Sequence, residues 1–195
     1  MYAALLDTNT IFPSVRRDFL LSLAVEGLYR PLWSAGVLDE LHRVTIRVKI
    51  RRGDEEAKAV TYADRLIEQI QKNFDDALVE GSDGLIGTYG LPDPADEHVV
   101  AAAVVGGAGT IVTENLKDFP RSLVPANLQI QHPTEFAADT VDVGPESAVR
   151  ALVMVSERRR NPPISPDEVL KILVYRYGMT DVGDILQPYV EQLAN

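Results

Sequence analysis

The first ten residues, MYAALLDTNT (1–10), decide the fold, because a short apolar run from Tyr2 to Leu6 leads directly into Asp7-Thr8-Asn9. Such a run predicts a buried strand that ends in a turn. Working outward, we expect further strands at residues 29–33, 77–79, 110–113 and 128–131. Helices are expected between them, at residues 12–26 with Pro13 in the first turn, at 35–52 after a Ser34 cap, from an Asp54 cap to Phe74, and at 95–105. Strands that alternate with helices predict a parallel sheet with helices on both faces.

The C-terminal part of the chain has a different pattern. After about residue 140 only helical patterns remain, and Asp142 to Pro145 has the composition of a linker. Helices are expected at residues 145–160, 166–177 and 180–193. We therefore predict an α/β domain over residues 1–135, a linker over 136–144 and a small helical module over 145–195.

Composition narrows the classes of function. The 195 residues are 46% hydrophobic and 25% charged, which is ordinary for a soluble globular protein. The absence of cysteine excludes disulfides, zinc–thiolate sites and cysteine nucleophiles, and it suits the cytoplasm. No apolar stretch approaches the roughly 18 residues that a membrane span needs. The net charge of −10 repels phosphates, so nucleic-acid binding would require a locally positive surface or bound cations.

Two carboxylates occur where an ordinary core would not place them. Asp7 directly follows the first strand, and ligands of open α/β sheets bind at the carboxyl ends of strands. Glu40 lies on or beside the apolar stripe of its helix, which is made by Val37, Leu41, Val44 and Val48. A carboxylate there is costly without a partner. The alternatives are a surface turn residue for Asp7 and a border residue that reaches water for Glu40.

Further polar residues precede one helix and follow another strand. Asp93 and Asp96 stand at the start of the helix expected at 95–105, where one acid, but not two, is explained by capping. Asn115 and Asp118 follow the strand at 110–113 and are expected to point inward, with Glu114 in solvent. Several carboxylates in one cleft repel each other and take up protons unless a hard divalent cation such as Mg²⁺ binds them.

Four segments resemble, in order, the acidic motifs of PIN-domain nucleases, and the chain is most similar to the VapC-type toxins among them. These segments are LLDTN at 5–9, LDEL at 38–41, PADEHVVAAAV at 94–104 and VTENLKDFP at 112–120. The tail, with FAADTVD, ERRRNPP and SPDEVLKIL, is similar to the helical C-terminal extension of one subgroup of these toxins. The resemblance implies a three-layer α/β/α fold with a central parallel sheet, plus a small all-helical extension.

The resemblance also implies a Mg²⁺- or Mn²⁺-dependent endoribonuclease that cleaves single-stranded or loop RNA and forms the toxin of a toxin–antitoxin pair. Asp7, Glu40 and Asp96 occupy the positions of the metal-binding acids. Asn115 falls where many relatives carry a fourth Asp, and Asp118 or Asp93 could supply the missing charge. Thr8, Asn9 and Thr113 would stand beside the site. An antitoxin partner and a homodimer are likewise implied by the resemblance alone.

A cationic stretch, HRVTIRVKIRR at 42–52, follows Glu40 on the same helix. Arg43, Arg47 and Arg51 recur every four residues and therefore share one ridge. A cationic ridge leading to an acidic metal cleft is the arrangement expected for a phosphodiester substrate. The same arginines could instead form a solvated face or dock an acidic antitoxin segment.

Two other classes of function remain open at this stage. A degenerate PIN module would bind RNA or a partner without cleaving, and Asn115 and the net charge of −10 favour it. A phosphatase of the haloacid-dehalogenase type also has an Asp after its first strand. That chemistry usually needs a second acid two residues later, where this chain has Asn9.

Overall fold

The computed structural model describes residues 2–12 and 14–193, and these form two compact units. An α/β unit contains residues 3–12 and 31–130. A helical unit contains Tyr2 with residues 14–30 and 131–193. The expected helix over 12–26 is confirmed as α2 (Ser14–Val25), and a short helix that was not expected, α1 (Thr8–Ile11), precedes it. The predicted position of Pro13 lies outside the described residues.

A four-stranded parallel sheet forms the centre of the α/β unit, which confirms the predicted fold class. The strands β1 (Ala3–Leu6), β2 (Arg30–Leu32), β3 (Thr110–Val112) and β4 (Gln129–Gln131) lie in the order β2-β1-β3-β4. The strand predicted at 77–79 is only an isolated bridge between Leu78 and Trp33. Two backbone hydrogen bonds make this bridge: the Trp33 N–H donates to the Ala77 carbonyl, and the Val79 N–H donates to the Trp33 carbonyl. The pairing does not extend into a ladder of strand length.

Burial on both faces explains why the central strands are continuous apolar runs. Leu5 and Leu6 of β1 and Ile111 and Val112 of β3 have no exposed surface. Helix α5 (Glu97–Val105) contacts both strands, and its buried alanines at positions 101–103 allow a close approach. The helix therefore begins at a fixed position relative to the strand ends.

The order of the strands places a crevice at the carboxyl ends of β1 and β3. From β1 the chain continues to β2 on one side, whereas β3 pairs with β1 on the other side, with Leu6 opposite Val112. Such a reversal of strand order is where open α/β sheets bind ligands. Asp7 and Thr113 are the first residues beyond these two strands.

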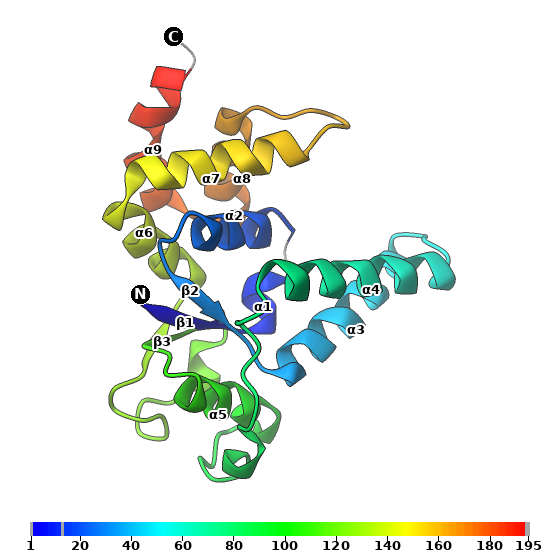
Figure 1. Ribbon diagram of the computed structural model, residues 1–195, viewed down its shortest axis with the longest axis vertical. Coiled ribbons are helices and arrows are strands. Elements are labelled where there is room, and N and C mark those ends of the chain that lie inside the picture. The colour runs from blue at the N-terminus through cyan, green and yellow to red at the C-terminus, as the bar shows by residue number, and fades with distance from the viewer. Residues whose placement is uncertain (1, 13, 194–195) are drawn as a thin grey trace. The chain divides into compact units, whose positions relative to one another are not determined.

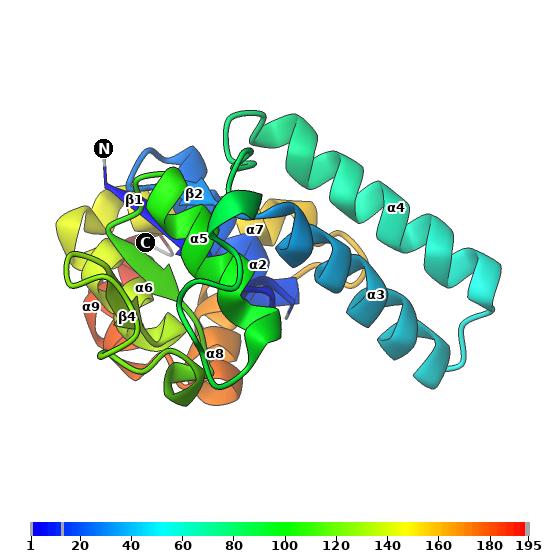
Figure 2. The same ribbon diagram turned by 90° about the horizontal axis from the view of Figure 1, so that it is seen from below.

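Helices α3 (Ala35–Arg51) and α4 (Glu56–Asn73) lie side by side as a long pair in Figures 1 and 2. As predicted, Ser34 caps α3, and its hydroxyl accepts the Val37 N–H at 3.1 Å. The predicted Asp54 cap of α4 is wrong, because Glu55 occupies the N-cap position. Asp54 instead pairs with Lys49 at 3.1 Å. Single turns η1 (Asp83–Leu85), η2 (Pro94–Asp96) and η3 (Leu116–Asp118) complete this unit.

The helical unit combines α2 with α6 (Pro133–Val143), α7 (Pro145–Arg158), α8 (Pro166–Tyr177) and α9 (Thr180–Leu193). Helix α6 covers most of the predicted linker 136–144, so that Gly144 alone separates α6 from α7. The division into domains at 135 and 145 stays a prediction. No helix among the described residues is both long and apolar enough to cross a membrane.

Close packing joins α2 and the loop after it to the C-terminal helices. The ring of Tyr29 meets that of Phe136 edge to face, with 4.9 Å between centroids. Arg150 pairs with Glu26 at 2.7 Å. A Cβ at Gly183 of α9 would lie 2.6 Å from Val174 of α8, so these helices touch through a glycine. The C-terminal module thus forms its core together with a helix from the first thirty residues.

Candidate functional site

Asp7 is held rigidly at the carboxyl end of β1. Its own N–H extends the sheet by donating to the Val112 carbonyl at 3.0 Å. Its Oδ1 accepts the Thr8 N–H at 2.6 Å, and its Oδ2 accepts from Asn9 Nδ2 and from Thr113 Oγ1, both at 2.7 Å. Only 5% of the residue is exposed. The carboxylate therefore has one fixed orientation.

Asn9 and Thr113 tie the ends of β1 and β3 together. The Asn9 amide donates to Thr113 Oγ1 at 3.1 Å, and its carbonyl accepts the Glu114 N–H at 2.9 Å. Thr113 Oγ1 also accepts the Asn115 N–H at 3.1 Å. Thr8 links the same turn to α3 by donating to the Val37 carbonyl at 3.3 Å. The three predicted supporting residues thus form one network around Asp7.

The pKa of Asp7 lies above its ordinary value. Burial is the largest cause, and the nearby charge of Glu40 acts in the same direction. The hydrogen bonds from Thr113, Thr8 and Asn9 oppose the rise, because they stabilise the charged form. Glu40, from a different helix, is therefore close enough to Asp7 for the two charges to interact.

Asp96 is the most perturbed acid of the site. It is half-buried at the end of η2, and its pKa is raised to about 7. Burial is the largest cause, followed by the charges of Asp7, Asp93, Asp118 and Glu40. The other four predicted acids therefore lie within electrostatic range of Asp96.

The donors of these five acids fit a hard divalent cation, because they are all oxygen atoms and their charges repel one another. A bound cation would remove that repulsion. Among the described residues, however, no three acidic or histidine side chains already lie close enough together to hold an ion. The acids therefore interact through their charges, but their side chains are not arranged around a single ion position.

Glu40 corrects one expectation from the sequence. The buried face of α3 consists of Val37, Leu38, Leu41 and Thr45, whereas Val44 and Val48 are only half-buried. The apolar stripe is thus rotated from the expected one, and Glu40 is exposed. Exposure reduces the cost of its charge, and its effect on Asp7 and Asp96 still places it within electrostatic range of both acids.

The remaining predicted site residues have different environments. Asp93 is exposed and caps η2 by accepting the Ala95 N–H at 2.8 Å. Asp118 is half-buried and acts on Asp96 through its charge. Asn115, expected to point inward with Asp118, is exposed, and its N–H is used by Thr113. Asp118 is therefore closer to the role of a fourth acid than Asn115.

Glu97 is a buried carboxylate that sequence reasoning missed. It accepts the N–H groups of Tyr89, Gly90 and Leu91 at 3.3, 2.8 and 3.3 Å. Burial favours the neutral form, but these backbone hydrogen bonds outweigh it and hold the pKa of Glu97 below its ordinary value. Glu97 thereby fastens the loop that leads to Asp93 onto the start of α5. An acid in the first turn of a helix is common, so the sequence carries no signal for this role.

His98 connects the helices that carry Glu40 and Asp96. Its Nδ1 lies 2.7 Å from the Ser34 hydroxyl, and a Cβ at Gly36 would lie 2.9 Å from its Nε2. Burial lowers the pKa of His98, and the charge of Glu40 partly opposes this effect. The start of α3 is thus positioned against α5 by a histidine that packs over a glycine.

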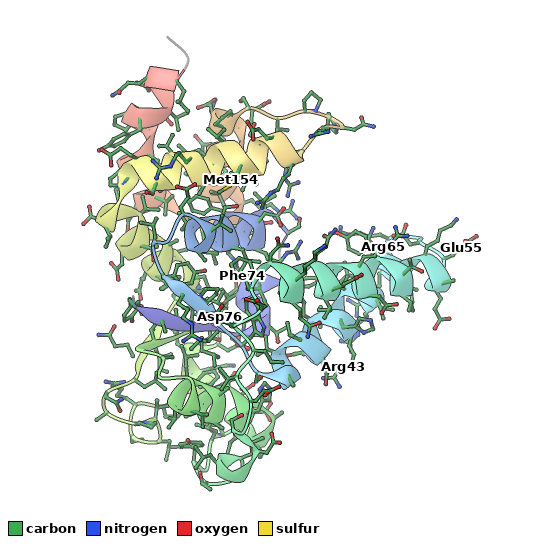
Figure 3. All side chains as sticks on the ribbon, viewed as in Figure 1. Arg43, Glu55, Arg65, Phe74, Asp76 and Met154 are labelled. Atoms are coloured by element: carbon green, nitrogen blue, oxygen red, sulfur yellow. The ribbon has the colours of Figure 1, made fainter. Side chains whose placement is uncertain are left out.

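The predicted arginine ridge lies on the exposed side of α3. Arg43, Arg47 and Arg51 are all exposed, and Figure 3 shows the side chain of Arg43 extending from the helix. The ridge begins three residues after Glu40. It is the only basic series that the sequence places on the same helix as a predicted metal-binding acid.

The chain belongs to the PIN-domain family, whose model it matches over residues 3–117, more than half of its length. Residues 133–187 match a second family model, the VapC50 C-terminal domain. Together the two matches confirm the resemblance to VapC-type PIN proteins that carry a C-terminal extension.

One relative is similar to part of the chain. The chain is 37% identical over 79 residues to the protein named "Putative ribonuclease VapC50" from Mycobacterium tuberculosis. The alignment covers 40% of this chain and 47% of that protein, so the similarity spans about half of the relative. No solved structure matches the chain.

Proposed function

We propose that this chain is a divalent-metal-dependent endoribonuclease and the toxin of a toxin–antitoxin pair. The observation that carries the proposal is the set of four acids that act electrostatically on Asp96, among them Asp7 at the carboxyl end of β1. Burial, together with the charges of these four neighbours, raises the pKa of Asp96 to about 7. Family membership and the printed name of the relative support RNA as the substrate.

Asp7, Glu40 and Asp96 would hold Mg²⁺, or Mn²⁺ in its place. When bound, the ion supplies charge neutralisation at the phosphate and activation of the attacking water. Asn9 and Thr113 keep the Asp7 carboxylate in one orientation, and Thr8 fixes the same turn against α3. Pre-organisation of this kind reduces the rearrangement needed when substrate binds.

The residues around these acids would complete the site. Asp118, with Asp93, contributes the negative charge that Asn115 lacks. Hydrolysis adds water to one phosphodiester and breaks one P–O bond, and Arg43, Arg47 and Arg51 would hold phosphates of the strand on either side. Single-stranded or loop RNA fits this arrangement, because its backbone can follow an exposed ridge into the crevice.

Family membership supports a proposal for the partners and the location of the chain. The toxins of this class pair with an antitoxin, and we propose an antitoxin and a second copy of the chain as partners in the cytoplasm. The arginine ridge would accept an acidic antitoxin segment when it is not occupied by RNA.

A second candidate function is RNA or partner binding without cleavage. Asn115, which carries no charge, favours this second function. So do the acids, because no three of them among the described residues lie close enough together to hold an ion. The two functions differ in one respect: only the nuclease requires a divalent cation to alter the RNA.

The deciding experiment incubates the purified chain and its Asp7→Asn variant with cellular RNA in Mg²⁺, in Mn²⁺ and in chelator, and sequences the new ends. We expect specific cleavage by the unmodified chain in metal alone, and its loss in Asp7→Asn. Asp83→Asn removes an equal charge from an exposed position outside the site and should retain cleavage. Binding of RNA without new ends in any metal would favour the second function, and cleavage by Asp7→Asn would reject the site.

A further inference from the structure

The helical unit carries a pocket, called the cavity below, that is widely open to solvent and that the proposed nuclease site does not use. Its volume is about 480 Å³, and it lies between the start of α2, the residue after α7 and one face of α8. Arg159, Lys171 and Arg176 line it together with Tyr175 and the apolar residues Val15 and Ile172. Three cations around one cavity are unexpected in a chain whose net charge is −10.

The cations of this cavity are only partly neutralised. Lys171 pairs with Asp167 at 2.6 Å within α8, and Arg159 pairs with Asp18 at 2.9 Å. The Lys171 pair is largely exposed, so it is weak and easily exchanged for another anion. Arg176 has no carboxylate partner among the described residues and instead lies over the ring of Tyr177.

Arg159 has an unused hydrogen-bond donor. Its Nε is buried and has no partner among the described residues. A buried donor without an acceptor is costly, and an anionic oxygen is the acceptor that a guanidinium binds best. Arg159, which lines the cavity, therefore has a donor left for an anionic ligand.

Tyr175 adds an aromatic surface at the edge of the cavity. It is 85% exposed, the highest exposure among the large hydrophobic residues of the described chain. It stands one helical turn after Lys171, so the ring and this cation are neighbours on α8, and Arg176 lines the same cavity. An exposed aromatic ring beside cations is the combination with which proteins bind single-stranded nucleic acid.

We propose that this cavity binds single-stranded RNA, with phosphates at Lys171, Arg176 and Arg159 and a base stacked on Tyr175. An acidic peptide would use the cations but leave the exposed ring without a role, so the ring favours RNA. The inference concerns binding in the helical unit and goes beyond cleavage. It holds whether or not the acids of the α/β unit cleave.

The test measures the affinity of the full chain for a fluorescent uridine decamer in chelator, across a series of salt concentrations. Tyr175→Ala removes the stacking surface and should weaken binding by about tenfold. Lys171→Gln with Arg176→Gln should weaken binding and make the logarithmic salt slope shallower by about 1.4, which corresponds to two lost phosphate contacts. The altered residues are exposed, so thermal melting should stay unchanged.

A matched control removes two exposed lysines of α4, as Lys58→Gln with Lys72→Gln. It changes the net charge equally and should leave the slope unaltered. Unchanged affinity in both cavity variants would overturn the proposal and leave the nuclease proposal standing. Equal binding by Tyr175→Ala, with displacement of the decamer by polyglutamate, would instead identify the cavity as a docking site for an acidic protein segment.

Discussion

The acidic crevice of the α/β unit and the cationic cavity of the helical unit have opposite charges and are built in different ways. In the crevice, Asp7 is buried and accepts three hydrogen bonds, and burial together with neighbouring charges disfavours the ionised form of Asp96. In the cavity, Tyr175 is almost fully exposed, and Lys171 pairs on the surface. The first arrangement concentrates unfavourable charge on a rigid frame, as chemistry requires, whereas the second offers loosely held groups to a flexible ligand.

This contrast also explains why net charge is a poor guide to partners. The value of −10 is a sum over both regions and describes neither. Acids that would bind metal contribute to it, although a bound divalent cation would offset part of their charge. A nucleic-acid-binding protein can therefore be acidic when its acids and its cations occupy separate surfaces.

Asp96→Asn should have the largest effect on the acidic crevice. If the charge of Asp96 destabilises the fold but is needed to bind metal, this variant should lose RNA cleavage by at least about 100-fold, because it removes a proposed metal ligand. The same change removes a repelled charge, so the metal-free protein should melt about 2–4 °C higher at pH 8, as expected for roughly 1 kcal/mol after allowance for partial exposure. Cleavage assays and thermal melts in chelator measure the two effects. A variant that loses both activity and stability would contradict the trade-off.

The pH dependence of the metal-free protein sharpens the same point. The pKa of Asp96 is about 7 in the folded chain and lies above its ordinary value of 3.8. The folded state therefore binds the proton more tightly, so this residue favours folding below about pH 4 and that contribution is lost as the pH rises to about 7. Melting temperatures recorded in chelator should show a gap between Asp96→Asn and the unmodified chain that grows from pH 5 to pH 7 and then stays constant. A gap of equal size throughout would assign the stability change to packing.

Thr113→Val tests whether the hydrogen bonds that orient the Asp7 carboxylate are needed for cleavage. Valine has nearly the same shape but loses the donor to Asp7 and the acceptor for the Asn115 N–H. We expect cleavage to fall by about tenfold, as for other residues that orient a ligand rather than bind the ion. Thr61→Val, on the exposed side of α4, serves as the matched control. Equal activity in both variants would mean that Asp7 is oriented without Thr113.

Strong local signals made most of the fold predictable. The buried strands β1 and β3 are continuous apolar runs, and Ser34 caps α3 as expected. Helix α6 was missed because its sequence, PTEFAADTVDV, carries acids and threonines that suit a linker equally well. Its buried Phe136 reveals the helix only when Tyr29, more than a hundred residues away, packs against it. The Asp54 cap was wrong because α4 begins one residue later, with Glu55 as its N-cap, while Asp54 pairs with Lys49.

The candidate site could likewise be predicted only in part from the sequence. Asp7 and Asp96 could be found because each stands at the end or start of a predictable element. The exposure of Glu40 could not be predicted, because four valines and leucines at helical spacing left two possible buried faces on α3. Glu97 gave no signal, since its partners are backbone groups of a loop whose path the sequence does not define.

The smallest expected effect concerns the arginine ridge, which is the cationic surface of the α/β unit. If the ridge guides RNA, Arg47→Gln should weaken binding of the uridine decamer in chelator by about threefold and make the logarithmic salt slope shallower by about 0.7, which corresponds to one phosphate. Arg65→Gln, on the exposed face of α4 (Figure 3), removes an equal charge outside the ridge and should have no effect. An unchanged slope in Arg47→Gln, together with the expected loss in the Lys171 and Arg176 variant, would assign RNA binding to the helical unit. The ridge would then be left as a surface for an acidic antitoxin segment, because exposed arginines that do not bind phosphate still attract carboxylates.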